Sequence, residues 1–273
     1  MIKSIATVLL LLSPVVALAS DAGYPLDHIT PDLTNKASLQ RGAQTYVNYC
    51  LGCHSLKYQR YKRTATDLEI PDALLLEHLV FDPNVKIGDL IENSMSDENA
   101  KYWFGAAPPD LTLHSNLKGG PDWIYTYLRT FYEDESRPFG VNNLVFENVG
   151  MPHVLVGLQG RQIRPECKQI PRLAPNGGLM RDPITDDLLT TQKCGEEIAE
   201  GHHYPLEIIK GTGSMTALEY DELIYDLANF LYYMGEPARI DRTRIGVYVL
   251  LFLAFFYVFT WLLGREYQKE FHK

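Results

Sequence analysis

The stretch Cys50-Leu51-Gly52-Cys53-His54 decides how the rest of the chain is interpreted. It separates two thiols by two residues and places an imidazole directly after the second thiol. This pattern is typical of covalent haem attachment, in which each sulfur bonds one vinyl group and the histidine binds the iron. We therefore predict one haem c, attached through Cys50 and Cys53, with His54 as an axial ligand of the iron.

Three other interpretations of this motif compete with haem attachment, and the simplest is a chance occurrence of unrelated thiols beside a histidine. A thioredoxin-like dithiol would be expected at the end of a strand in a βαβ unit, and the residues before Cys50 do not have the pattern of a strand. A structural zinc site would require a second close pair of ligands, but Cys167 and Cys194 are far apart in the sequence. A membrane-anchored structural subunit that binds zinc is therefore the non-redox alternative.

Apolar runs at both ends of the chain predict export and membrane anchoring. Residues 1–19 combine one lysine, a long apolar stretch and Ala17-Leu18-Ala19, the pattern of a cleaved signal peptide. Residues 245–263 are uncharged and would span about 28 Å as a helix, enough to cross the hydrocarbon core. Because the export signal sets the orientation, we expect a single-pass inner (cell) membrane protein with its haem domain on the periplasmic side.

The domain organisation follows from these boundaries. We predict a signal peptide (1–19), a periplasmic haem domain (20–236), a linker (237–244), a transmembrane anchor (245–263) and a cytoplasmic tail (264–273). Within the haem domain, residues 159–204 are rich in proline and glycine and indicate an excursion from the core, with a hairpin turn at Pro175–Gly178. In an exported protein, the remaining cysteines, Cys167 and Cys194, are expected to form a disulfide at its base.

Helical periodicity dominates the haem domain. A helix with Ser38 as its predicted N-cap should end at the haem motif, and the last soluble helix should begin at the capping box of Thr216 and Glu219 and close at Gly235. Residues 68–80 and 122–132 also have helical spacing. The aromatic stripe of the second of these segments is interpreted as core.

A second axial ligand would make the haem an electron carrier and not a binding site for small ligands. Met151 is the preferred candidate, because the sequence Gly-Met-Pro allows the chain to approach a flat cofactor and restricts the loop. Met215 is the second choice, and His114 and His153 are the histidine alternatives. Residues 103–111, with aromatic residues and prolines, predict a rigid, non-helical wall against the porphyrin edge.

The net charge of the 273-residue chain is −9. This excess of negative charge argues against nucleic acid and against an anionic membrane surface as the main partner, and it favours a basic protein partner. Acidic clusters at Asp97-Glu98 and Glu133–Glu135 are the candidate docking groups.

Several motifs, in their order along the chain, resemble the cytochrome c1 family of bacterial type, the membrane-anchored haem subunits of the cytochrome bc1 complex. The matching residues are Arg41-Gly42 before the haem motif, Ser55, Lys57, Tyr58 and Arg60 after it, Ala107-Pro108-Pro109-Asp110-Leu111, Gly150-Met151-Pro152, Glu236-Pro237 and the C-terminal anchor. The resemblance implies a mostly α-helical, class I cytochrome c-like haem domain with loop insertions, and His54 and Met151 as axial ligands. The family's arginines after Pro-Pro-Asp-Leu are absent from residues 112–118, so no arginine is implied as a partner of the haem propionates, and Lys118 is only a weak substitute.

The resemblance also implies a function. It is one-electron transfer from the Rieske iron–sulfur subunit to a mobile or membrane-bound cytochrome c within ubiquinol–cytochrome c reductase, beside cytochrome b. In that role the chain is an electron-transfer subunit without a catalytic site of its own. The alternative is a membrane-tethered c-type cytochrome that feeds another terminal reductase or oxidase.

Overall fold

The computed structural model describes residues 24–117, 119–165, 167–172, 178–182, 185–194 and 206–271. The predicted signal peptide, residues 1–19, lies outside these ranges. Helices dominate the described chain, and its strands are short and occur only in two-stranded pairs. The mostly α-helical fold predicted from the sequence is confirmed.

The elements have the following bounds. The helices are α2 (Lys36–Tyr49), α3 (Tyr61–Asp67), α4 (Asp72–His78), α5 (Asp97–Phe104), the 3-10 helix η1 (His114–Asn116), α6 (Gly120–Arg129), α7 (Val156–Gln159), α8 (Ala217–Gly235) and α9 (Arg239–Phe271). The antiparallel strand pairs are β1 (Leu56–Arg60) with β2 (Leu90–Ile91), β3 (Phe131–Glu133) with β4 (Val141–Asn143), β5 (Gln162–Ile163) with β8 (Glu207–Ile208), and β6 (Cys167–Pro171) with β7 (Thr190–Cys194).

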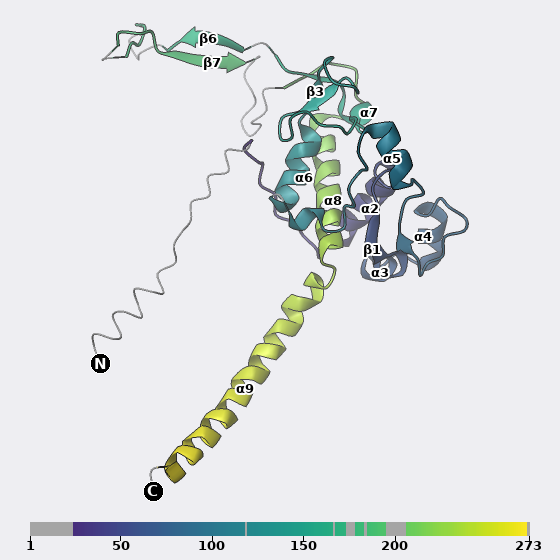
Figure 1. Ribbon diagram of the computed structural model, residues 1–273, viewed down its shortest axis with the longest axis vertical. Helices are drawn as coiled ribbons and strands as arrows, with labels where there is room; N and C mark the ends of the chain where they lie inside the picture. The colour runs from purple at the N-terminus through teal and green to yellow at the C-terminus, as the bar shows by residue number, and fades with distance from the viewer. Residues whose placement is uncertain are drawn as a thin grey trace.

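The core of the domain forms where α2 and α6 pack against α8 (Figure 1). Leu39 and Tyr46 of α2 and Leu227 of α8 are completely buried there. At Gly42 the two backbones come so close that an added Cβ would lie 2.1 Å from the carbonyl oxygen of Asp226. Glycine at this position therefore sets the distance between the helix that leads into the haem motif and the last soluble helix.

The start of α2 differs from the prediction. Ser38 is not the N-cap, because the helix begins at Lys36 and the side chain of Asn35 accepts a hydrogen bond from the Ser38 backbone N–H at 3.1 Å. Ser38 is instead buried, and its hydroxyl accepts a hydrogen bond from Asn229 of α8 at 3.0 Å. Ser38 thus serves a contact between helices, which periodicity alone does not reveal.

The helix predicted over residues 68–80 is confirmed only over α4, Asp72–His78, because residues 68–71 and 79–80 are not helical. The chain is helical in α3, breaks after Asp67 and becomes helical again in α4 from Asp72. Glu69 has a left-handed φ of 59° between the two helices, and Pro71 disfavours helical geometry in the residue before it. The last soluble helix, by contrast, has the predicted capping box of Thr216 and Glu219 and ends at Gly235.

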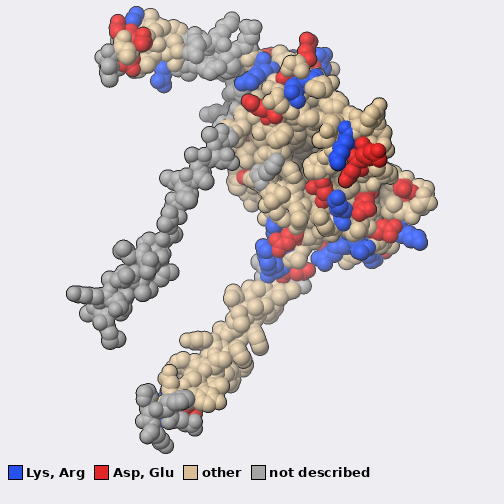
Figure 2. Space-filling model, in the orientation of Figure 1, with Lys and Arg blue, Asp and Glu red and all other residues tan. Residues whose placement is uncertain are grey.

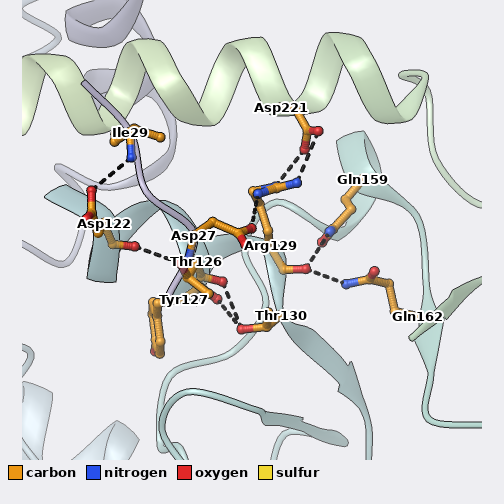
Figure 3. Close-up of polar contacts among 10 residues, drawn as sticks. All are labelled: Asp27, Ile29, Asp122, Thr126, Tyr127, Arg129, Thr130, Gln159, Gln162 and Asp221. Carbon is orange, nitrogen blue, oxygen red and sulfur yellow. Dashed lines mark hydrogen bonds and ion pairs between the residues drawn. The ribbon is translucent and has the colours of Figure 1, made fainter. Parts of the chain in front are cut away.

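A buried ion network around Arg129 holds the N-terminal arm on the helices (Figure 3). Arg129, at the end of α6, is only 5% exposed and donates to Asp27 of the arm at 2.7 Å and to Asp221 of α8 at 2.6 Å. The side-chain amides of Gln159 and Gln162 donate to the Arg129 carbonyl at 3.1 and 2.9 Å. The network joins the N-terminal arm, α6, α7, β5 and α8, so it holds these elements at a fixed spacing.

The β6–β7 hairpin projects from the domain and lies within the predicted excursion, residues 159–204 (Figure 1). Its backbone register pairs Cys167 with Cys194. The predicted turn at Pro175–Gly178 lies outside the described residues except for Gly178.

Helix α9 leaves the domain as one long, exposed helix (Figure 1). Its segment Ile245–Lys269 is, among the described residues, the one candidate for a membrane span by length and composition. Because α9 begins at Arg239, most of the segment predicted as a linker, residues 237–244, is helical. The helix also continues beyond residue 263 to Phe271, through most of the predicted tail.

Candidate haem site

A cavity of about 450 Å³ lies between the end of α2, α6, α8 and the loop around Met151. Its wall is almost entirely apolar and includes Leu227 and Leu231 of α8. Phe104, Pro108 and Pro109 form part of the wall predicted for residues 103–111. That segment is not wholly non-helical, because Trp103 and Phe104 end α5, and Trp103 does not line the cavity. The cavity therefore has the size and the apolar character of a site for a bound organic group.

The three residues of the haem motif line this cavity together. Cys50 is the C-cap of α2, and the chain then turns so tightly that the backbone N–H groups of Cys53 and His54 both donate to the Cys50 carbonyl, at 3.0 and 2.8 Å. The turn places both thiols and the imidazole in one wall, which is the arrangement that the Cys-x-x-Cys-His spacing predicts.

The orientation of His54 is determined by its hydrogen bonds. Its Nδ1 lies 2.8 Å from the carbonyl oxygen of Pro109. A carbonyl can only accept, so Nδ1 carries the proton and the Nε2 lone pair is available to a metal. Burial lowers the pKa of His54, which favours the neutral imidazole that binds metals. Tyr46 of α2 supports the same turn by donating to the His54 carbonyl at 2.5 Å.

The thiol of Cys50 does not resemble that of a redox-active dithiol. Burial raises its pKa to about 12, whereas reactive cysteines have a lowered pKa. The motif also follows a helix and not a strand, contrary to what the thioredoxin-like interpretation requires. In the part of the chain that the structure describes, no group of three His, Cys, Asp or Glu side chains is placed to hold a metal ion, so that part provides no zinc ligand set.

Met151 lies in the wall of the same cavity. The hydroxyl of Tyr127 donates a hydrogen bond to its sulfur at 3.5 Å. Tyr127 is only 8% exposed, and its ring stacks on Trp123 with centroids 4.5 Å apart and packs edge-on against Phe131 at 5.1 Å. Burial raises the pKa of Tyr127, so the hydroxyl keeps its proton as a donor. The interpretation of the aromatic stripe of residues 122–132 as core is only partly right: Tyr127 and Phe131 are buried, but Trp123 and Tyr127 also line the cavity. The sequence did not indicate that the stripe also contacts the candidate ligand.

The other candidates for the second ligand have different surroundings. Met215 does not line the cavity, and its backbone N–H donates to the Leu158 carbonyl at 3.1 Å. His153 is buried outside the cavity, where its Nε2 lies 2.8 Å from Gln159 and burial lowers its pKa to about 4. His114 does line the cavity, with its ring edge-on to Trp123 at 5.1 Å. The cavity thus offers Met151 and His114, but neither Met215 nor His153.

The donor set fits a c-type haem. Two thiols, a neutral imidazole and a thioether meet in one apolar cavity that is flanked by aromatic residues and prolines. Among the described residues that line it, none is a lysine or an arginine. Lys118, the weak substitute for the family's propionate partner, lies outside the described residues.

The helical fold, the cavity and the long apolar helix near the C-terminus define a cytochrome-like haem protein with a membrane-anchoring segment. A family model described as "Cytochrome C1 family" matches residues 29–163. The chain is 45% identical to a cytochrome c1 of Allochromatium vinosum, over 99% of both chains. It is 37% identical to a protein of Nitrosomonas europaea named ammonia monooxygenase gamma subunit, over 96% of both chains, and 25% identical to a mitochondrial cytochrome c1 haem protein of Kluyveromyces lactis, over 86% of this chain and 72% of the relative. The chain belongs to the cytochrome c1 family, whose members carry haem and take part in electron transport.

Proposed function

We propose that this chain transfers single electrons from the Rieske iron–sulfur subunit to a soluble or tethered cytochrome c, as the c-type haem subunit of ubiquinol–cytochrome c reductase. The observation that carries the proposal is the convergence of Cys50, Cys53, His54 and Met151 on one apolar cavity. The haem supplies the one-electron couple when it is bound. The chain needs no catalytic site of its own for this role.

Each of the four residues has a separate task in this proposal. Cys50 and Cys53 attach the single haem c through thioether bonds. His54 offers Nε2 to the iron, because Pro109 holds Nδ1. Met151 would offer its sulfur as the second ligand, and a soft thioether ligand favours ferrous iron and raises the reduction potential. The apolar wall limits the access of water, which tunes the potential further.

The anchor and the domain boundaries complete the proposal. After removal of residues 1–19, the haem domain would lie on the periplasmic side and α9 would cross the inner membrane once, with cytochrome b and the Rieske subunit as neighbours. Gly235 ends α8 and α9 begins at Arg239, so the haem domain would lie close to the bilayer. This position is the one needed to receive electrons from a membrane-bound donor.

Copurification tests the assignment to the complex. Full-length protein extracted in mild detergent should carry a covalent haem, seen as a pyridine haemochrome, together with a b-type cytochrome and an iron–sulfur protein. Haem without these two partners would favour the alternative, a tethered cytochrome that feeds another reductase or oxidase. A chain without haem would contradict both interpretations.

The substitution Met151→Leu tests the second ligand. Leucine nearly preserves the volume of the side chain, so folding and haem attachment should survive while the sulfur is lost. We expect loss of the ferric sulfur-to-iron absorption band and a strong decrease in the reduction potential. Met215→Leu is the matched control and should change neither. The opposite pattern would transfer the ligand role to Met215, and a band that survives both substitutions would exclude both methionines.

A further inference from the structure

The loop that carries Met151 has an unusual backbone conformation just before the methionine. Asn148 has a φ of 61°, in the left-handed region that residues with a side chain rarely adopt. Asparagine tolerates this region better than most residues, but the conformation still needs support from neighbouring groups. The direction in which the chain leaves Asn148 determines where Gly150 and Met151 lie.

Arg137 supplies much of this support. Its Nη1 donates to Asn148 Oδ1 at 3.2 Å, and its Nη2 donates to the Asn148 carbonyl at 2.8 Å and to the Val149 carbonyl at 3.4 Å. Val149 is buried and lines the haem cavity. A single planar guanidinium thus holds the two residues that precede Gly150-Met151.

Arg137 and Asn148 are themselves tied to a rigid hairpin. The Arg137 backbone N–H donates to the Asp134 carbonyl at 3.0 Å in the turn between β3 and β4. Asn142 of β4 accepts a hydrogen bond from the Asn148 N–H at 2.9 Å and donates to Asp134 at 2.9 Å. The loop is therefore fastened to the hairpin from two sides, through its N–H and through its carbonyls.

The contacts of Arg137 are not those of an ordinary stabilising arginine. Among the described residues it forms no ion pair within 4.0 Å, and the side-chain hydrogen bonds found for it all go to Asn148 and Val149. Its Nε is buried without a hydrogen-bond partner in the described chain, which opposes stability. Its side-chain hydrogen bonds therefore go to the loop that carries Met151.

We infer that Arg137 and Asn148 are positioning residues that clamp the loop so that the Met151 sulfur stays at the haem iron. The inference rests on the proposed ligation by Met151. Neither residue lines the cavity that contains the ligand sulfur, and both act through the backbone of residues 148 and 149. Without the clamp, Met151 should leave the iron more often, although the haem stays attached through Cys50 and Cys53.

Competition with added imidazole measures this directly. An external ligand binds ferric haem only when Met151 is displaced, so its apparent affinity reports the population of the displaced loop. In the full-length protein in detergent, Arg137→Gln should increase the apparent affinity for imidazole about tenfold, the order expected when hydrogen bonds from a charged donor are lost. The ferric sulfur-to-iron band should weaken in parallel, and Arg137→Lys should restore part of both signals.

Two variants of Asn148 separate the effect of its backbone conformation from the effect of its side-chain hydrogen bond. Asn148→Gly keeps the left-handed conformation and loses only Oδ1, so its effect should be smaller than that of Asn148→Ala, which disfavours the conformation as well. Arg161→Gln is the matched control, because Arg161 is an exposed arginine that pairs with Glu133 and not with the loop. The control should bind imidazole within twofold of the wild type.

The outcomes separate the clamp from the ligation itself. If Met151→Leu binds imidazole far more tightly than the wild type while Arg137→Gln and Asn148→Ala match the wild type, the clamp is wrong and the ligation stands. If the wild type already binds imidazole as tightly as Met151→Leu, the ligation by Met151 is wrong. If Asn148→Gly increases the apparent affinity for imidazole as much as Asn148→Ala does, the clamp does not act by holding the left-handed backbone of Asn148, and that part of the inference is wrong.

Discussion

Among the described residues, Tyr127 donates a side-chain hydrogen bond to the sulfur of Met151, the candidate iron ligand. The rings of Trp123 and Phe131 hold the phenol in place, so the direction of this hydroxyl is determined by packing. An O–H group directed at the sulfur places the positive end of its dipole toward the sulfur and draws electron density from it. It should therefore destabilise the ferric form more than the ferrous form and raise the reduction potential.

The substitution Tyr127→Phe should lower the midpoint potential and leave the haem attached. A single hydrogen bond contributes about 0.5–1.5 kcal/mol, which corresponds to a decrease of roughly 20–60 mV for a one-electron couple. Tyr125→Phe is the matched control: Tyr125 lies on the same helix and outside the cavity lining, with Arg129 4.3 Å from its ring centroid. A redox titration in which both variants titrate like the wild type would exclude the tuning role of Tyr127.

At the level of residues, the sequence predicted the groups whose chemistry depends on short spacing. Cys50, Cys53 and His54 lie within one helical turn, so their common position in the wall could be expected from the motif itself. The contacts of Tyr127 and Arg137 could not be expected, because each joins two segments that come together only in the folded chain. A tyrosine in an aromatic stripe has the same local pattern whether or not its hydroxyl reaches a ligand.

At the level of elements, the packing of α2 against α8 is the contact most sensitive to one added atom. An added Cβ on Gly42 would also lie 2.6 Å from the Cβ of Phe230, besides the close contact with the Asp226 carbonyl. We expect Gly42→Ala to force the helices apart and to lower the free energy of unfolding by about 1–3 kcal/mol. Thermal unfolding of the detergent-solubilised protein measures this. Gly88→Ala is the control, since nothing lies within 4 Å of an added Cβ there. Equal melting temperatures for the two variants would contradict the close approach.

The β6–β7 hairpin gives structural support to the predicted disulfide. Cys167 and Cys194 are direct partners in the antiparallel register, and such partners have Cα atoms about 4.5–5.5 Å apart, within the range that a disulfide spans. The bond would contribute about 3.6 kcal/mol in the chain-entropy model. Peptide mapping without reductant should recover the two cysteines in one cross-linked peptide. Two free thiols in protein purified without reductant would exclude the bond.

Helix boundaries were predicted more accurately where the sequence signal acts within a few residues of the boundary. The boundaries of α8 were predicted well, because the capping box and the terminal glycine act within a few residues. The helix predicted over residues 68–80 was placed to start too early, because apolar periodicity was given more weight than Pro71, after which α4 begins. Ser38 was misassigned because a buried serine that bonds Asn229 has the same local pattern as an N-cap.

At the level of the whole molecule, the net charge of −9 does not make the two predicted acidic clusters equally suitable for docking a basic partner. Lysines and arginines are interspersed with acidic side chains over much of the face that Figure 2 shows. In the predicted cluster Glu133–Glu135, Glu133 pairs with Arg161, and Asp134 accepts hydrogen bonds from Ser136 and Asn142. The cluster Asp97-Glu98 is different, because it forms the exposed first turn of α5, whose last residue, Phe104, lines the haem cavity.

We therefore expect electrostatic steering of a basic electron acceptor to depend on Asp97 and Glu98 more than on Glu133. The rate of electron transfer to a basic cytochrome c should fall as ionic strength rises, because salt limits the reach of surface charges to about 8–10 Å. Asp97→Asn combined with Glu98→Gln should lower the rate about two- to threefold at low salt and approach the wild type at high salt. Glu77→Gln is the control, because this exposed residue lies on α4, which contributes nothing to the cavity wall. If the rate does not change with ionic strength, charge does not guide the encounter, and the exposed aromatic residues at the cavity, such as Phe146, become the candidates for docking.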